Sequence, residues 1–119
     1  MLPKNTTILV ATQPVNMNLS FDRLAGIVRS SLQQEPRDPI LVLFHNRRGT
    51  HVKLLWHDTS GYCIFYQRLD KGAFRFPLTI PPHAQKVLIS KRELLLLLEG
   101  IDMDLIRAAQ RRAKERGSH

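Results

Sequence analysis

Two adjacent arginines in a polar turn are the strongest candidates for chemistry in this sequence. Arg47 and Arg48 lie between an apolar run that ends at Phe44 and the residue Gly49, and Lys53 follows shortly after. Guanidinium groups at the tip of a hairpin can hold phosphates through paired hydrogen bonds. We therefore predict a nucleic-acid contact at Arg47, Arg48 and Lys53, with a merely solvated polar turn as the alternative.

Further cations could extend this positive surface. Lys71 and Arg75 lie around Gly72 in a later glycine-containing turn, and Arg37 precedes the apolar run. The whole chain carries 18 Lys and Arg against 10 Asp and Glu, a formal charge of +8 with a pI near 10.4. Such a balance favours polyanionic partners, which are DNA or RNA, or an acidic face of another protein.

The histidines raise the alternative of a small nuclease. His45 and His51 flank the arginine turn, where they could act as acid and base while cations hold a phosphate. His51 and His57 would lie roughly 20 Å apart on one strand at ~3.3 Å per residue, too far to share a metal ion. The aspartates fall at turn or cap positions. We therefore predict no catalytic residues, no metal and no cofactor, and the histidine-dependent nuclease stays as the alternative.

The aromatic residues divide between core and surface. Strand alternation places Trp56 with Val52 and Leu54 on an apolar face, so we expect it in the core. Tyr66 is the better candidate for an exposed ring that could stack on a base. The single Cys63 cannot form an internal disulfide, which favours a reducing, cytoplasmic setting. No apolar run approaches the length of a membrane span.

The surrounding pattern predicts an α+β fold, with a mainly antiparallel curved sheet of about five short strands. Strands are expected over residues 6–11, 40–44, 51–56, 62–69 and 86–89, with a further short piece at 74–76. Ser20 should cap a helix that runs to about residue 33 and packs on the sheet. Residues 1–102 should form a single domain, followed by a basic helix and tail over 103–119.

A leucine-rich helix near the end of the chain is the candidate partner surface. Ser90 and Glu93 fit a capping box, and Gly100 marks the helix end. Five consecutive leucines cover every side of a helix, so one or two should stay exposed and could bind a partner. These residues are Leu94, Leu95, Leu96, Leu97 and Leu98. A helix buried between neighbours is the alternative.

The final predicted helix, over residues 103–116, is strongly basic. We expect Arg107 and Arg111 to contact an acidic partner or the DNA backbone, while a solvated helix end is the alternative. Strand order and oligomeric state are not fixed by the sequence, and a homo-oligomer stays open.

The central residues resemble a known family. Phe44-x-x-Arg47-Arg48-Gly49, Val52-Lys53-Leu54-Leu55-Trp56-x-Asp58 and Gly61-Tyr62-Cys63-Ile64-Phe65-Tyr66-x-Arg68-Leu69 are similar to the small accessory protein, TnpB, of insertion sequences of the sixty-six type. Lys71-Gly72-x-Phe74 continues the resemblance, and residues 21–28 and 95–102 are similar to the family's first helix and its leucine-rich close. The similarity covers about residues 8–102.

The resemblance implies a non-catalytic accessory role in transposition. The expected partners are DNA, the element-encoded transposase or another small accessory protein, without a membrane. Beside the nuclease, the second alternative is a pure protein–protein scaffold without DNA contact. One segment departs from the family pattern. The family typically has Asp-Met-Arg-Lys where this chain has Asn16-Met17-Asn18-Leu19, so two cations of the relatives are missing.

Overall fold

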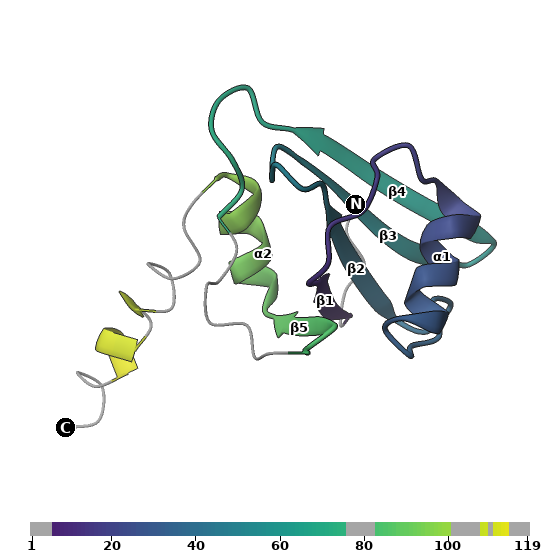
Figure 1. The fold of residues 1–119 in the computed structure, drawn as a ribbon. Helices are drawn as coiled ribbons and strands as arrows, with labels where there is room; N and C mark the ends of the chain where they lie inside the picture. Colours follow the sequence, from purple (N-terminus) through teal and green to yellow (C-terminus); the bar gives the residue numbers. More distant parts are fainter. Residues whose placement is uncertain (1–5, 76–82, 101–107, 110, 115–119) are drawn as a thin grey trace.

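A five-stranded sheet forms the centre of the part of the chain that the computed structural model describes, residues 6–75, 83–100, 108–109 and 111–114 (Figure 1). The strand order is β4-β3-β2-β1-β5. The strands are β1 (Thr7–Ala11), β2 (Ile40–His45), β3 (His51–Asp58), β4 (Gly61–Arg68) and β5 (Lys86–Ile89). All neighbours are antiparallel except β1 and β2. The predicted α+β class and mainly antiparallel sheet are confirmed.

The one parallel pair follows from the helix between its strands. The helix α1 (Phe21–Ser30) connects β1 to β2, and a parallel pair needs such a crossover because its strands start at the same end. The strands β2, β3 and β4 are joined by two hairpin turns and are antiparallel. The strand β5 then returns to the far side of β1, so that β1 lies inside the sheet.

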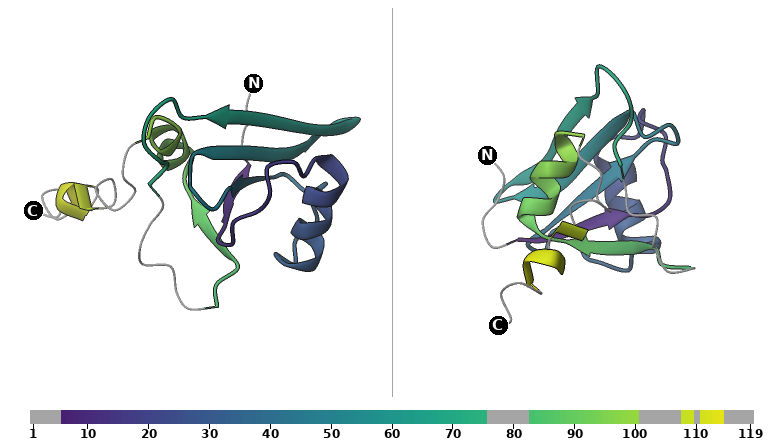
Figure 2. Two further views of the ribbon diagram at one scale, coloured as in Figure 1. Left: turned by 45° about the horizontal axis from the view of Figure 1, so that its top comes forward. Right: turned by 90° about the vertical axis from the view of Figure 1, so that its left-hand side faces the viewer.

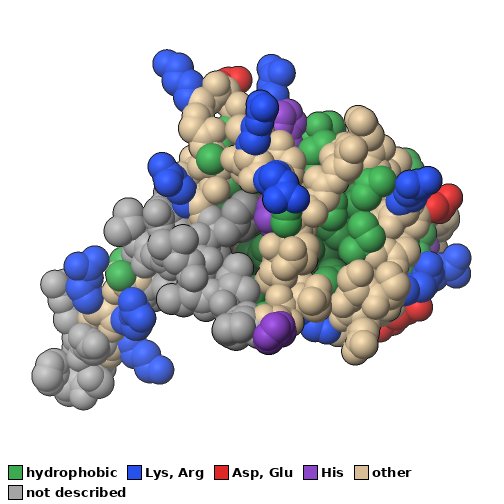
Figure 3. All heavy atoms as spheres, in the orientation of Figure 1, with side chains coloured by type: hydrophobic (Ala, Val, Ile, Leu, Met, Phe, Trp, Pro, Cys, Tyr) green, Lys and Arg blue, Asp and Glu red, His purple; other side chains and the backbone are tan. Residues whose placement is uncertain are grey.

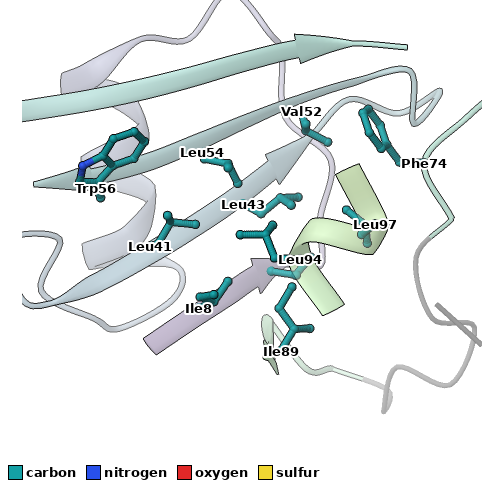
Figure 4. Close-up of a cluster of buried hydrophobic side chains, with 11 residues drawn as sticks. Ile8, Leu41, Leu43, Val52, Leu54, Trp56, Phe74, Ile89, Leu94 and Leu97 are labelled. Carbon is teal, nitrogen blue, oxygen red and sulfur yellow. The ribbon is translucent and has the colours of Figure 1, made fainter. Parts of the chain in front are cut away.

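The core has two halves because both faces of the sheet are covered in part. On β2, Leu41 and Leu43 point to one face, and Val42 and Phe44 point to the other. The first face packs against the helix α2 (Lys91–Leu98), as Figure 4 shows, and the second packs against α1. The two helices lie at different ends of the sheet (Figure 2). The apolar character of β2 on both sides is therefore explained by burial.

Several element boundaries differ from the sequence prediction. The helix α1 ends at Ser30 rather than near residue 33, because Gln33 adopts a left-handed φ of 54° and stops the helix. Ser20 occupies the N-cap position but its side chain makes no capping hydrogen bond. Phe74 lies in no strand and instead packs into the core beside α2. Arg75 likewise lies in no strand, so the expected 74–76 strand is wrong at both of its described residues, and residue 76 lies outside the described part of the chain.

The start of α2 agrees with its predicted capping box. The Ser90 hydroxyl oxygen accepts a hydrogen bond from the Glu93 backbone N–H at 3.1 Å, and the Glu93 carboxylate accepts one from the Ser90 N–H at 3.0 Å. Gly100 follows the helix with a φ of 85°. Of the expected last helix, residues 108–109 and 111–114 are helical, and residues 103–107, 110 and 115–116 lie outside the described part of the chain. None of the described helices is long and apolar enough to cross a membrane.

Candidate nucleic-acid interface

The turn between β2 and β3 presents the two adjacent arginines. This arginine turn, residues 46–50, closes with a hydrogen bond from the Gly49 N–H to the Asn46 carbonyl at 3.0 Å. The Asn46 side-chain oxygen also accepts from the backbone N–H groups of Thr50 and His51, at 2.9 and 3.1 Å. Asn46 therefore fixes the turn from inside, and Arg47 and Arg48 are left exposed at its tip.

The loop after β4 packs directly on the arginine turn. This β4 loop, residues 69–75, joins it through a hydrogen bond from the Leu69 N–H to the Thr50 carbonyl at 2.9 Å, and one from the Phe74 N–H to the Gly49 carbonyl at 2.7 Å. Gly49 is suited to this contact because it has a φ of 70° and a Cβ there would lie 3.4 Å from the Phe74 carbonyl oxygen. Two distant turns are thereby held at one end of the molecule.

This end of the molecule is rich in cations. Arg47 and Arg48 on the turn and Lys71 and Arg75 on the β4 loop are exposed, and the only acidic residue in segments 46–51 and 66–75 is Asp70. In the space-filling view, Lys and Arg side chains gather over the loops at the upper end, with little acidic surface among them (Figure 3). Four of the five predicted contacts thus share one surface.

The fifth predicted contact, Lys53, lies elsewhere. Its side chain is only 8% exposed, on the sheet face that also carries α1. Its ammonium donates to the Leu19 carbonyl at 2.8 Å and lies 4.8 Å from the centre of the Tyr66 ring. Lys53 therefore has an internal partner, and the proposed phosphate contacts do not include it.

Two shallow hollows adjoin the arginine turn. The first, the arginine hollow, has a volume of about 380 Å³. The second, the Tyr66 hollow, has about 280 Å³ and is lined by His51, Tyr66 and Arg68. His51 lines both, so the two are neighbours. The lining residues of the arginine hollow are Val15, Asn16, Met17, Asn46, Arg47, Arg48, Thr50 and His51.

The Tyr66 hollow contains residues that the sequence did not bring together. His51 pairs with Arg68 across β3 and β4, and Lys53 pairs with Tyr66, so all four side chains share one face of the sheet. Arg68 was missed because its position in a strand gave no sign of a nearby site. The signal was present in the alternation of β4, which places residues 66 and 68 on the same face.

The histidines of the nuclease alternative are engaged in structural contacts. The two ring nitrogens of His45 face carbonyl oxygens, Nε2 that of Ala11 at 3.0 Å and Nδ1 that of Asn46 at 3.2 Å. The His51 Nδ1 lies 2.7 Å from the Thr50 hydroxyl and 3.2 Å from the Asn46 amide nitrogen. Among the hydrogen bonds between described residues, none joins the two histidines. In the described part of the chain, no three His, Cys, Asp or Glu residues converge on a common point.

The exposed part of the predicted leucine surface is much smaller than five residues. Leu94 and Leu97 are 0% exposed and form part of the core under α2. Leu96 and Leu98 are partly buried against the same cluster. Leu95 alone of the five is markedly exposed, at 46%. Arg111 is exposed, and Arg107 lies outside the described residues.

Comparison with known proteins gives a family and two relatives. A family described as IS66 Orf2 like protein matches residues 6–108. The Sinorhizobium fredii protein y4hO is 36% identical over 104 residues, which cover 86% of this chain and 88% of the relative. The protein y4jC of the same organism is 30% identical over 95 residues, covering 80% and 79%. Both relatives are described as uncharacterized. No solved structure matches the chain significantly.

The family match spans the arginine turn, both hollows and α2. It confirms the resemblance carried by the central residues from Phe44 to Phe74. The matched family is an accessory, non-catalytic one among the proteins of these insertion sequences. The chain therefore belongs to the IS66 Orf2-like family of transposition accessory proteins.

Proposed function

We propose that this accessory protein binds DNA through the phosphate backbone, with Arg47, Arg48, Lys71 and Arg75 as its contacts. One observation carries the proposal. The arginine turn and the β4 loop are tied by two backbone hydrogen bonds, so four exposed cations are held on one surface. A loop backbone that is fixed before binding loses less conformational freedom when its cations meet phosphates. Because the family has an accessory role in transposition, DNA is the polyanion that we expect these cations to bind.

The salt dependence of DNA binding tests this proposal. Each phosphate contact increases the steepness of the fall of log K with log salt by about 0.9 for duplex DNA. The double variant Arg47→Ala/Arg48→Ala should therefore bind more weakly, with a slope smaller by about 2. Fluorescence anisotropy with labelled duplex from the terminal repeats of the element, over a range of salt concentrations, measures both quantities.

A matched control separates a local contact from the general charge. Lys91→Ala/Arg92→Ala also removes two positive charges, but from the exposed first turn of α2. If both double variants weaken binding equally, the interface is not at the arginine turn. Scrambled duplex of equal length shows whether the repeats are recognised, because backbone contacts alone would give equal affinities.

We also propose a protein contact at Leu95 and Arg111, with the transposase or the other small protein of the element as partner. The exposed apolar side chain of Leu95 supports it, since the other four leucines of α2 are buried or partly buried. Leu95→Asp should abolish co-purification with the transposase and leave DNA binding unchanged. Retained co-purification would remove α2 from the interface.

A further inference from the structure

We propose that His51, Tyr66 and Arg68 form a site for an unpaired nucleotide, whose base stacks on Tyr66 and whose phosphate Arg68 holds. The site extends the proposed backbone contact and rests on it. It adds a different kind of recognition, because a base can stack on a side chain only when its flat face is free. The occupant is therefore a nucleotide of a single strand rather than of an intact duplex.

The Tyr66 ring is both exposed and held in place. It is 52% exposed, a large fraction for an aromatic side chain within a strand. The Lys53 ammonium lies 4.8 Å from its centre and is itself anchored on the Leu19 carbonyl. The His51 ring lies 5.9 Å away, centre to centre, at an angle of 44°. The ring thus has fixed neighbours and still leaves much of its surface to solvent, where a base can stack.

The hydrogen bonds of His51 determine which of its nitrogens faces a ligand. The Asn46 side-chain oxygen is held by two backbone N–H groups, so its amide nitrogen must point to Thr50 and His51. That nitrogen donates, and the Thr50 hydroxyl can pass a hydrogen bond on to Nδ1 of His51. In neutral His51 the proton therefore lies on Nε2, which can donate to a phosphate or to a base carbonyl.

Arg68 completes the site with a charge. It pairs with His51 across the two strands and lies two residues from Tyr66 on the same face. The hollow of about 280 Å³ is just below the usual range of small-molecule pockets, about 300–1,000 Å³, and suits one flat group rather than a large ligand. Because His51 also lines the arginine hollow, a strand leaving the stacked base would meet Arg47 and Arg48 next.

The test compares oligonucleotides that differ only in their bases. Fluorescence anisotropy would measure binding of a short single-stranded oligothymidylate and of an abasic strand of the same length. The wild type should prefer the strand with bases. Tyr66→Leu should lose about 5- to 150-fold in affinity for that strand and should bind the abasic strand as the wild type does. Tyr66→Phe should keep the preference because stacking needs only the ring.

Two controls make the result specific. Phe21→Leu removes a similarly exposed aromatic ring, at 43%, from the start of α1 and should change nothing. Tyr66→Leu should also leave the salt slope unchanged, since a stacked ring releases no counterions, whereas Arg68→Ala should lower it by about 0.7 for a single strand. Circular dichroism would verify that each variant is folded.

The outcomes of these experiments distinguish the nucleotide site from the proposed backbone contact. Equal binding of the two strands by the wild type, or an unaltered preference in Tyr66→Leu, would overturn the nucleotide site while duplex binding at the arginine turn could still hold. If the wild type bound neither the single strands nor duplex DNA, both the nucleotide site and the backbone proposal would be overturned. A matched oligouridylate strand shows whether the site binds DNA or RNA. Tyr66→Leu should have the larger effect on the kind of strand that the site binds.

Discussion

At the scale of single residues, the organisation of the proposed interface depends on Asn46. One side-chain oxygen accepts from the N–H groups of Thr50 and His51, and one side-chain nitrogen contacts the Thr50 hydroxyl and the His51 ring. A single amide thus shapes the turn that presents two arginines and orients the histidine shared by both hollows. The residue that shapes this turn therefore carries no charge.

Replacement of Asn46 should therefore destabilise the protein. Asn46→Ala leaves two backbone N–H groups of a partly buried turn without their acceptor, which costs about 1–3 kcal/mol. Urea denaturation followed by Trp56 fluorescence measures the loss. Asn16→Ala is the matched control, because Asn16 accepts one exposed local hydrogen bond, from the Asn18 N–H, and should cost far less. Equal losses would show that the turn is held by other contacts.

A second residue-scale effect concerns acid stability. The pKa of Glu35 is lowered from its ordinary value near 4.5, chiefly by the hydrogen bond from the Arg37 backbone N–H and then by Arg29, which lies 3.3 Å away. A lowered pKa stabilises the fold above pH 4.5, and this contribution disappears as the pH falls through the native value. The pKa of Arg29 is raised, chiefly by its hydrogen bond to Glu35, and so adds no change in this range.

Glu35→Gln should consequently lower the denaturation midpoint at neutral pH and have no effect well below pH 4.5. The effect should be small, because the two side chains are 49% and 47% exposed and water screens the pair. Parallel urea titrations of wild type and variant over this pH range provide the measurement. A difference that grows on acidification would contradict the assignment.

At the scale of elements, the two helices begin with the same residue type in different roles. Ser90 takes part in a reciprocal capping box, whereas the side chain of Ser20 makes no capping bond. Ser90→Ala should therefore cost about 0.5–2 kcal/mol of stability, and Ser20→Ala should stay within about 0.5 kcal/mol. Thermal unfolding of the two variants compares them directly. A larger loss at Ser20 would contradict the assigned roles.

The stability lost when a leucine of α2 is replaced by alanine should depend on how deeply its side chain is buried. Leu97→Ala removes a fully buried side chain and should cost about 2–5 kcal/mol. Leu95→Ala should cost within about 0.5 kcal/mol because that side chain is largely outside the core. Chemical denaturation distinguishes the two. Similar losses would mean that Leu95 is covered in solution, for example by a second copy of the chain.

The elements were largely predictable, and their contacts were not. Apolar alternation located the strands, and the Ser90 and Glu93 pattern located α2, because these signals are local. The position of Lys53 was not predictable, since its burial depends on Leu19, 34 residues away in sequence. The junction of the two loops depends likewise on a hydrogen bond between Phe74 and Gly49. Cations could be identified from sequence, but not which of them share a surface.

At the scale of the whole molecule, the strand order sets which parts of the backbone are best protected. The strands β1, β2 and β3 have neighbours on both sides, while β5, of four residues, pairs with β1 alone among the described strands. Amide hydrogen exchange should therefore be slowest for residues such as Leu9 and Leu43, and faster along β5. Exchange monitored by NMR tests this, and uniform rates across the sheet would contradict it.

The place of β1 inside the sheet has a consequence for biosynthesis. The ribosome makes β1 before any partner strand, yet β1 is closed on its outer side by β5, and Thr12 bonds to Ala84, 72 residues later. At about 5–20 residues per second, that interval lasts roughly 4–15 seconds. During this time the apolar Ile8, Leu9 and Val10 lack a neighbour on that side. Nascent chains that have not yet reached β5 are therefore the form most exposed to aggregation and to chaperone binding.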